Sequence, residues 1–341
     1  MRLPGAVALR RLAAAGALVL AATLPGPGAN AQAPEPRTIR VVKQPIAALA
    51  PFVVAAVKDL DREFGVDIVL EPVASDAQNM AALVDGTVAV SPCTFDAIAR
   101  LRDIGKDAIA VYNLAGGPIR DLVVGRRVPD ATQDMPAPRR LALLRGMRIG
   151  YSTPGSPSDS LARMVLAKGA GLDPATDVEM VRVGSIAGMT AALAAGEIDA
   201  FMLPPPAAQH AAATGTGRVL IASGDLVAAR ASSYALCTMV QYVRQNPLVI
   251  AGFVKAVQRG NDWVRQNTDE SVRLMQAAFP EIAPEAWAAG LPAALPGLSP
   301  DGRFEAEAVR IRLAAAMELG LVEKAPDAAE GVLWTNQFLA R

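Results

Sequence analysis

The sequence predicts an α/β protein with two similarly built lobes, each around a parallel-rich sheet, followed by a helical C-terminal tail. Short β-branched runs alternate with amphipathic helical patterns over the first two thirds of the chain, and this order of elements occurs twice. Such alternation is typical of parallel strands joined by right-handed helical crossovers. From Pro247 onward the pattern is almost wholly helical.

The first series of elements ends near Gly125. Runs of apolar and β-branched residues indicate its strands, and apolar residues at helical spacing indicate its helices. We expect strands at 39–42, 67–70, 88–90, 108–112 and 121–125, and helices at 51–64, 78–84 and 94–102.

The second series follows a loop at 128–140 that contains three prolines. One part of it resembles the first series at a constant offset, since Ala81-Ala82-Leu83-x-x-Gly86-x-Val88 is matched 110 positions later by Ala191-Ala192-Leu193-x-x-Gly196-x-Ile198. This match supports two lobes of similar construction. We expect strands at 147–151, 178–183 and 198–203, and helices at 158–169 and 188–194.

Extended runs at 218–222 and 235–242 come next, and the second is suited to return the chain to the first lobe. The first lobe is therefore expected to comprise residues 32–125 and 234–341, and the second lobe residues 126–233. Tail helices are expected at 248–266, 268–278, 285–289 and 305–319, with the tail broken into pieces by Pro280, Pro284, Pro292, Pro296 and Pro300.

The first 31 residues have the pattern of a secretory signal peptide. Arg2, Arg10 and Arg11 precede an apolar run at 12–24, and Ala29-Asn30-Ala31 is a small-x-small cleavage pattern. The apolar run is shorter than the roughly 20 residues that span a bilayer. We therefore expect cleavage after Ala31 and export as a free protein.

Charge and composition exclude several function classes. The whole chain has 33 basic and 33 acidic residues, but removal of the three leader arginines leaves a mature chain near −3. This balance argues against a nucleic-acid-binding surface. One histidine and two cysteines argue against a zinc cluster, a His-based triad and a disulfide scaffold. No catalytic residue, metal or cofactor is expected.

The most informative segment runs from Gly150 to Asp159, between an expected strand and an expected helix. Ser156 is placed as the N-cap, Pro157 as the first helical residue and Asp159 as the third, which is a capping-box pattern. A Gly-rich turn of this kind also directs backbone N–H groups into the crevice above a parallel sheet. The alternative interpretation is a well-capped helix without a ligand.

Polar turns also follow the other expected strands. Small hydroxyl and amide residues at the carboxyl ends of parallel strands are what a ligand cleft requires. These turns contain Lys43-Gln44, Ser75-Asp76, Ser91-Pro92-Cys93-Thr94, Asn113 and Gly184-Ser185.

Three ordered stretches resemble the periplasmic solute-binding proteins of nitrate/sulfonate/taurine-type ABC importers. They are Gly-x-Arg-Ile-Gly-Tyr-Ser-Thr-Pro-Gly-Ser from Gly146, Val-x-Met-Val-x-Val-Gly from Val178 and Ala-Ala-Leu-Ala-Ala-Gly-Glu-Ile-Asp-Ala-Phe from Ala191. The resemblance covers about 39–266. It implies a two-lobed type II periplasmic binding fold with two crossover strands, which closes on a small-molecule ligand. The aromatic that the family carries in its first helix is only partly matched by Pro51-Phe52-Val53-Val54-Ala55.

The resemblance also implies the ligand contacts and the partner. The partner would be an ABC permease in the inner membrane, and the protein would act as a monomer without nucleic acid. Carried over by position, the contacts would come from Lys43, Gln44, Ser75, Ser91, Thr94 and Asn113 on one side, and from Ser152, Thr153, Ser156 and Gly184 on the other.

The charge of the ligand is open at this point. Helix ends and Lys43 favour an organic anion such as a sulfonate or carboxylate. If Asp76 and Asp159 face the cleft, a neutral or amine-bearing ligand such as a thiamine pyrimidine precursor is favoured instead. An enzyme related to thiamine-pyrimidine synthases is a further alternative, although this chain lacks the cysteine-rich motif and histidine of that family. Presentation of the ligand to a sensor is another.

The remaining chemistry-bearing residues have structural interpretations. His210 lies on an Ala-rich helix without partners nearby in sequence, so we expect a surface or partly packed histidine. Export permits a disulfide between Cys93 and Cys237, but their places in a cleft turn and a crossover strand favour two buried thiols. The three tryptophans are expected to be packing anchors.

Overall fold

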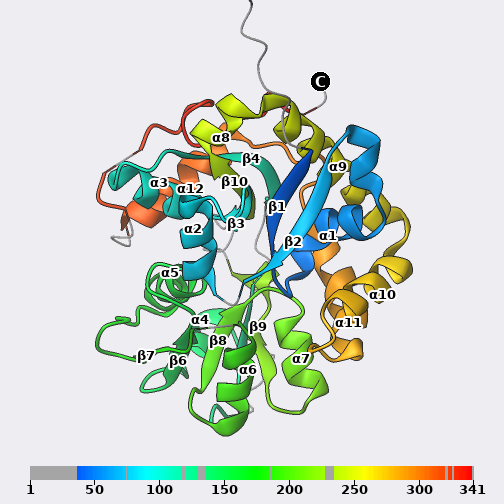
Figure 1. Cartoon of the computed structure of the whole chain (residues 1–341). Coiled ribbons are helices and arrows are strands. Elements are labelled where there is room, and N and C mark those ends of the chain that lie inside the picture. Colours follow the sequence, from blue (N-terminus) through cyan, green and yellow to red (C-terminus); the bar gives the residue numbers. More distant parts are fainter. Residues whose placement is uncertain are drawn as a thin grey trace, which may run out of the picture. The chain divides into compact units, whose positions relative to one another are not determined.

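Two small sheets are formed by residues of the expected first lobe (Figure 1). The computed structural model describes residues 37–73, 75–116, 120–129, 135–184, 186–226, 234–318, 322–324 and 326–339. Strand β1 (Thr38–Lys43) pairs in parallel with β2 (Asp67–Pro72). Strand β10 (Tyr234–Met239) lies between β3 (Ser91–Cys93) and β4 (Ala108–Ala115) and is antiparallel to both.

A five-stranded sheet is formed by the middle of the chain, in the order β7-β6-β8-β5-β9. Strand β6 runs parallel to β7 and β8, whereas β5 is antiparallel to β8 and β9. The sheets are therefore mixed rather than uniformly parallel, because the two strands that carry the chain between sheets, β5 and β10, run against their neighbours. The bounds are β5 Asp121–Val124, β6 Arg148–Tyr151, β7 Glu179–Arg182, β8 Ala200–Leu203 and β9 Arg218–Ile221.

The return of the chain through the run at 235–242 is confirmed, but the strand is shorter than expected. After β9 the chain re-enters the first group of sheets as β10, which ends at Met239. Helix α8 (Val240–Gln245) follows, so Tyr242 is helical. The expected strand at 88–90 is likewise wrong, since Val90 makes only an isolated bridge to Val41 before β3.

The helices mostly lie where the apolar spacing predicts them. They are α2 Asp76–Asp85, α3 Phe95–Asp103, α4 Ala137–Ala142, α5 Pro157–Met164 with the π-helical η3 Val165–Gly169, α6 Ile186–Ala195, α7 Ala207–Ala213, α9 Pro247–Gln266, α10 Thr268–Ala278, α11 Pro284–Ala294 and α12 Ala306–Glu318, with short 3₁₀ turns η1 Ala47–Leu49, η4 Ser223–Asp225 and η6 Leu295–Gly297. Pro292 lies inside α11, so the expectation that it breaks the tail is wrong.

The expected helix at 51–64 is two separate elements. Helix α1 (Ala50–Val57) ends before Asp59, whose φ of 55° is left-handed, and the 3₁₀ helix η2 (Leu60–Phe64) follows. The Asp61 carboxylate then accepts the backbone N–H of Ile68 at 2.6 Å and fixes the entry into β2. Burial raises the pKa of Asp61 and outweighs the backbone hydrogen bonds from Ile68 and Arg62, which lower it.

The 110-residue repeat in the sequence is a repeat of local structure. Gly86 and Gly196 both end their helices in left-handed conformation, with φ of 80° and 70°. In the first copy the Val88 N–H donates to the Ala82 carbonyl, and in the second the Ile198 N–H donates to that of Ala192. The two series therefore share a helix end as well as an order of elements.

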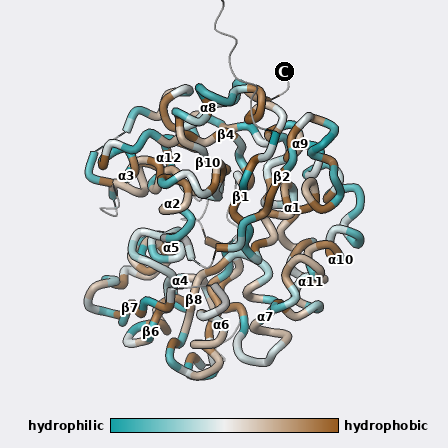
Figure 2. Tube along the Cα trace, in the orientation of Figure 1, coloured by the Kyte–Doolittle hydropathy of each residue, from teal (hydrophilic) through white to brown (hydrophobic). Residues whose placement is uncertain are grey.

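The described residues belong to one compact unit, Glu35–Arg341, and their buried apolar side chains form four clusters, of which the largest includes α1 and α9. Helix α1 is hydrophobic along its length in Figure 2 because other elements cover it, among them α9 and α10. At Gly260 of α9 an added Cβ would lie 1.9 Å from the Pro51 carbonyl oxygen, so only glycine allows this close approach. Trp287 of α11 is fully buried, as expected of a packing anchor.

The leader at 1–31 and its cleavage point lie outside the described residues. So do part of the loop at 128–140 and Ser185. Within the described part, no helix has both the length and the apolar character that crossing a bilayer requires. The division into two lobes stays a prediction.

Candidate functional site

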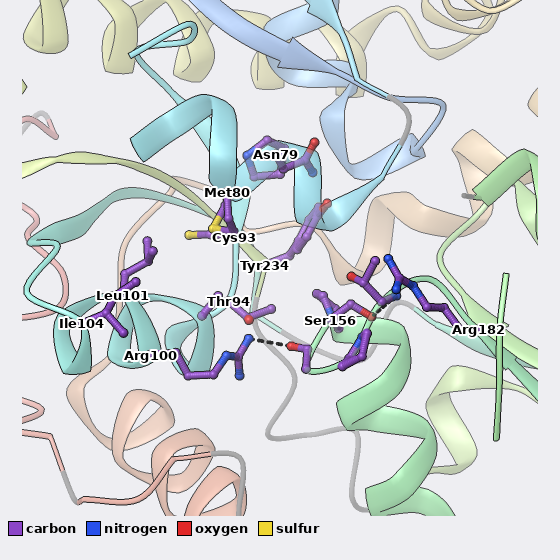
Figure 3. Close-up of a pocket in the computed structure, with 16 residues that line it drawn as sticks. Asn79, Met80, Cys93, Thr94, Arg100, Leu101, Ile104, Ser156, Arg182 and Tyr234 are labelled. Atoms are coloured by element: carbon purple, nitrogen blue, oxygen red, sulfur yellow. Dashed lines mark hydrogen bonds between the residues drawn. The ribbon is translucent and has the colours of Figure 1, made fainter. Parts of the chain in front are cut away.

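A cavity of about 410 Å³ lies between the turn that joins β6 to α5 and the helices α2 and α3 (Figure 3). It is at the carboxyl ends of β6 and β7, the edge of an α/β sheet at which ligands bind. Its lining comprises Asn79, Met80, Pro92, Cys93, Thr94, Ala97, Arg100, Leu101, Ile104, residues 153–157, Arg182 and Tyr234.

A second cavity, of about 290 Å³, lies at the opposite end of β6. Arg148 and Arg127 border it, but both bind the buried carboxylate of Asp199. Burial would raise the pKa of Asp199, yet the hydrogen bonds from Arg148 hold it below its usual range. These two arginines share one carboxylate within the fold, and the cavity lies away from the carboxyl ends of the parallel strands, so the larger cavity is the better candidate.

The turn between β6 and α5 forms one wall of the larger cavity, and its capping confirms most of the predicted pattern. Ser156 is the N-cap, and its Oγ accepts the backbone N–H of Asp159 at 3.2 Å. The Asp159 carboxylate accepts the N–H of Gly155 at 2.7 Å and Nε of Arg163 at 2.6 Å. In a capping box that carboxylate would accept the N–H of the N-cap residue, Ser156. It accepts the N–H of Gly155 instead, one residue before the N-cap. Asp159 is engaged within the turn and does not border the cavity.

Three serine hydroxyls support this turn from inside. The Ser158 Oγ lies 3.1 Å from that of Ser152 and 2.9 Å from that of Ser156, and it accepts the Ser152 N–H. All three residues are buried. Ser152 therefore braces the turn beneath the cavity, and Ser158, which the sequence reasoning missed, is the centre of the cluster.

The opposite wall is formed by α3, and its charged groups are paired over long sequence distances. Asp96 in the first turn of α3 is fully buried and accepts from Arg100 and from Arg312 of α12, each at 3.0 Å. Burial alone would raise the pKa of Asp96, but the two guanidinium groups, Arg312 first, outweigh it and hold that pKa below its usual range. Asp96 is therefore ionised at neutral pH.

Arg100 joins the two walls. Its NH1 donates to Asp96 on its own helix, and its NH2 donates to the Gly155 carbonyl across the cavity at 2.5 Å, the contact drawn in Figure 3. Gly155 has a φ of 71°, and a Cβ there would lie 3.1 Å from the Arg100 guanidinium carbon. Glycine suits the left-handed turn, and a Cβ in its place would crowd the Arg100 guanidinium.

The charge of the described lining has one sign. Arg100 and Arg182 are its only charged members, and no aspartate or glutamate side chain is among them. Thr94, Thr153 and Ser156 add hydroxyls, and Asn79 adds an amide. This combination suits an anion, although Asp96 offsets part of the charge of Arg100. The side chain of Asp76, which the sequence offered as a possible cleft carboxylate, lies outside the described residues.

Much of the remaining lining is apolar and includes a disulfide. Met80, Leu101 and Tyr234 contribute side chains, and Cys93 is bonded to Cys237. The expectation of two buried thiols is therefore wrong. The two cysteines are 144 positions apart in sequence but lie on the adjacent strands β3 and β10, with Cα atoms 6.0 Å apart.

Three of the ten expected ligand-contact residues border the cavity: Thr94, Thr153 and Ser156. Each of the other seven has a different place. Ser152 braces the turn as described above, Ser75 caps α2 through the Gln78 N–H, and Gly184 forms a left-handed turn after β7. The side chains of Ser91 and Asn113 donate to the carbonyls of Pro92 and Arg303. The Gln44 side chain accepts from Asn79, and the Lys43 ammonium lies 4.8 Å from the centre of the Phe279 ring. Whether any of the ten contacts a ligand stays a prediction.

The sequence reasoning missed four polar or aromatic residues of the lining: Asn79, Arg100, Arg182 and Tyr234. A usable signal existed for Arg182, which stands two positions before the predicted polar turn Gly184-Ser185. Arg100 follows Asp96 by one helical turn, and this spacing suggests only an ordinary surface pair. His210 is partly buried, in line with the expected surface or partly packed histidine, and its Nδ1 accepts the N–H of Ala283.

The chain resembles known proteins both in its sequence family and in its fold. A family model described as the NMT1-like family matches residues 32–277. No curated protein matches the sequence. A solved protein from Bordetella bronchiseptica RB50 is similar with a TM-score of 0.73 and 23% identity, over 89% of this chain and 96% of that one.

Two further solved structures are named for their ligands. The alkanesulfonate-binding protein SsuA from Xanthomonas axonopodis pv. citri, bound to MOPS, has a TM-score of 0.69 and 19% identity, over 87% of this chain and 97% of that one. The periplasmic nitrate-binding protein NrtA from Synechocystis PCC 6803 has a TM-score of 0.64 and 19% identity, over 73% and 68%. The expected α/β periplasmic binding fold with a helical C-terminal part is confirmed.

Proposed function

The chain belongs to the NMT1-like family, and on that basis we propose that it is the extracytoplasmic substrate-binding component of an ABC importer. It captures a small organic anion, such as a sulfonate or carboxylate, in the cavity between α3 and the β6–α5 turn. The observation that carries the proposal is the lining of that cavity, in whose described part the charged side chains are arginines and hydroxyls lie beside them.

Capture involves closure of two lobes around the ligand. Residues 32–125 and 234–341 form one lobe and residues 126–233 form the other. The chain joins the five-stranded sheet at β5, near the end of the first segment, and returns to the first group of sheets as β10. In support, the cavity lining combines residues of both segments, and Arg100 reaches from one to the carbonyl of Gly155 in the other. A ligand that binds the closed form better shifts the population toward it.

The protein acts as a monomer in the periplasm and hands its ligand to a permease of the inner membrane. In support, one structural relative is named as an alkanesulfonate-binding protein and another as a periplasmic nitrate-binding protein. The leader pattern, with cleavage after Ala31, supports export.

Binding occurs without turnover of the ligand. Both cysteines are joined in the disulfide, so neither is a free nucleophile. The described lining offers hydroxyls but no histidine or carboxylate within it that would activate one. Recovery of a chemically changed ligand after incubation with the purified protein would contradict this part of the proposal.

A second candidate ligand is neutral and has a donor and an acceptor side by side, as an aminopyrimidine does. The observation that favours it is the buried amide pair of Gln44 and Asn79, joined by one hydrogen bond at 3.0 Å. The other amide nitrogen of this pair and its other carbonyl oxygen have no partner among the described residues. Unpaired buried amide groups are costly, and Asn79, the member of the pair that borders the cavity, would present its carbonyl oxygen to a donor of such a ligand.

A thermal-shift panel distinguishes the two candidates. The mature protein is heated with alkanesulfonates, alkanoates, nitrate, aminopyrimidines and alkylamines, each at several concentrations. A ligand at 100 times its Kd stabilises the folded state by about 2.7 kcal/mol. We expect stabilisation by organic anions; stabilisation by the amines or aminopyrimidines alone would overturn the anion proposal.

A further inference from the structure

We infer that Arg312, on the C-terminal helix α12 and outside the cavity lining, is a positioning residue for the anion site. It acts through Asp96, and it sets both the orientation and the net charge of Arg100. This inference rests on the proposed function.

The contacts form one continuous ionic chain. Asp96 presents one carboxylate oxygen to Arg312 NH2 and the other to Arg100 NH1, each at 3.0 Å. Arg312 is 3% exposed and Asp96 is 0% exposed, whereas about a third of the Arg100 side chain is exposed. The two guanidinium groups do not compete, because each takes a separate oxygen. Arg312 is therefore a buried cation whose partner also holds Arg100.

The charge balance of this cluster depends on Arg312. Without Arg312, the charges of Asp96 and Arg100 would cancel, and the net charge of this cluster would be zero. An anion would then meet no net attraction from the cluster. With Arg312 present, the three groups carry one net positive charge, and the buried pair is poorly screened by solvent. Arg100 thereby keeps its attraction for an anion despite its own ion pair.

The orientation of Arg100 depends on the same contacts. A guanidinium has five N–H donors in a planar fork. In Arg100, one end of the fork is fixed on Asp96 and the other on the Gly155 carbonyl across the cavity. The side chain lines the cavity, so an anion there meets a guanidinium already fixed in position. Loss of Arg312 would free Asp96 to turn toward Arg100 and disturb this position.

A charge series tests the inference, with butane-1-sulfonate as the probe and its Kd measured by titration calorimetry. The cluster carries a charge of +1 in the unmodified protein, 0 in Arg312→Met, +2 in Asp96→Asn and +1 in the double variant. We expect the Kd of Arg312→Met to rise about tenfold, that of Asp96→Asn to fall about tenfold, and that of the double variant to return to within about threefold of the unmodified protein.

The matched control is Arg310→Met. Arg310 lies two positions before Arg312 on the same helix, is exposed, and pairs with Glu307 of the preceding turn. Its Kd is expected to be unchanged. If Arg312→Met does not fold, the same charge step is measured between Asp96→Asn and the double variant, where we expect about tenfold weaker binding in the double variant.

Two results would overturn the inference and are distinguishable. If the folded double variant binds the probe as weakly as Arg312→Met, Arg312 has a merely structural role, and the proposed function stands. If the unmodified protein binds neither butane-1-sulfonate nor any anion of the panel above, the proposed function fails, and the role of Arg312 fails with it.

Discussion

The two walls of the cavity are held in place in different ways. The β6–α5 turn is fixed by hydrogen bonds among residues 152–163, all close in sequence. The α3 wall is fixed by contacts across the chain, namely the Asp96–Arg312 pair, 216 positions apart, and the Cys93–Cys237 disulfide, 144 apart. One wall is thus specified locally, whereas the other exists only after the distant parts of the chain have folded together.

The largest effect is expected from removal of the disulfide. The loop that it closes is long, and loops of this order contribute about 4 kcal/mol to stability. The double variant Cys93→Ser/Cys237→Ser should lose about this free energy of unfolding, measured in urea, because the unfolded chain regains its freedom. Ligand affinity should also fall, because β3 and β10 border the cavity. A loss below about 1 kcal/mol would show that strand pairing alone holds this wall.

The second-largest loss of stability is expected from breaking the Asp96–Arg312 ion pair. Arg312→Met leaves a fully buried carboxylate with one partly exposed partner, and breaking a buried pair in this way costs about 3 kcal/mol. Asp96→Asn/Arg312→Met should recover most of that loss, since no charge is then left buried without its partner. Equal losses in the single and double variants, measured by urea unfolding, would contradict this account.

The same pair predicts a pH dependence. The depressed pKa of Asp96 means that its contribution to stability is present above the unfolded-state value of about 3.9 and is lost as pH falls toward the folded-state pKa. Asp121 differs, because burial raises its pKa and its protonated form is favoured in the folded state. Between pH 6 and 3 the unfolding free energy of Asp96→Asn should therefore vary less with pH than that of the unmodified protein. Asp121→Asn should steepen the loss on acidification; the opposite pattern would reverse these assignments.

The local wall should tolerate substitution better. Ser156→Ala removes the N-cap acceptor of α5 and one contact of the serine cluster, which should cost about 1 kcal/mol. Ser75→Ala is the matched control, because Ser75 caps α2 through a longer hydrogen bond of 3.3 Å to the Gln78 N–H in an exposed position. Urea unfolding should rank Ser75→Ala below Ser156→Ala. The reverse order would show that the serine cluster adds nothing to the cap.

This difference between the walls also explains what the sequence could predict. The cap at Ser156 and the 110-residue repeat follow from residues within one or two helical turns of each other, so the local pattern predicts them. The break at Asp59 was missed because the apolar spacing continues past it. Arg100, Arg312 and the disulfide were missed because their partners are determined by the order of strands and the packing of helices. The predicted site was therefore better on the local wall, where Thr153 and Ser156 were found, than on the α3 wall, where only Thr94 was.

The smallest expected effect tests whether burial, rather than distance in sequence, makes an ion pair between distant residues stabilising. Lys168 in η3 and Glu318 in α12 form another distant pair, at 2.9 Å, but both side chains are more than half exposed. An exposed pair contributes about 0.5 kcal/mol, because solvent and salt screen it. Glu318→Gln should therefore change the unfolding free energy by no more than this amount, and 0.5 M salt should remove the difference. Since α12 carries both this pair and Arg312, a large and salt-independent loss would mean that the docking of the helix, rather than the burial of the Asp96–Arg312 charges, stabilises the α3 wall.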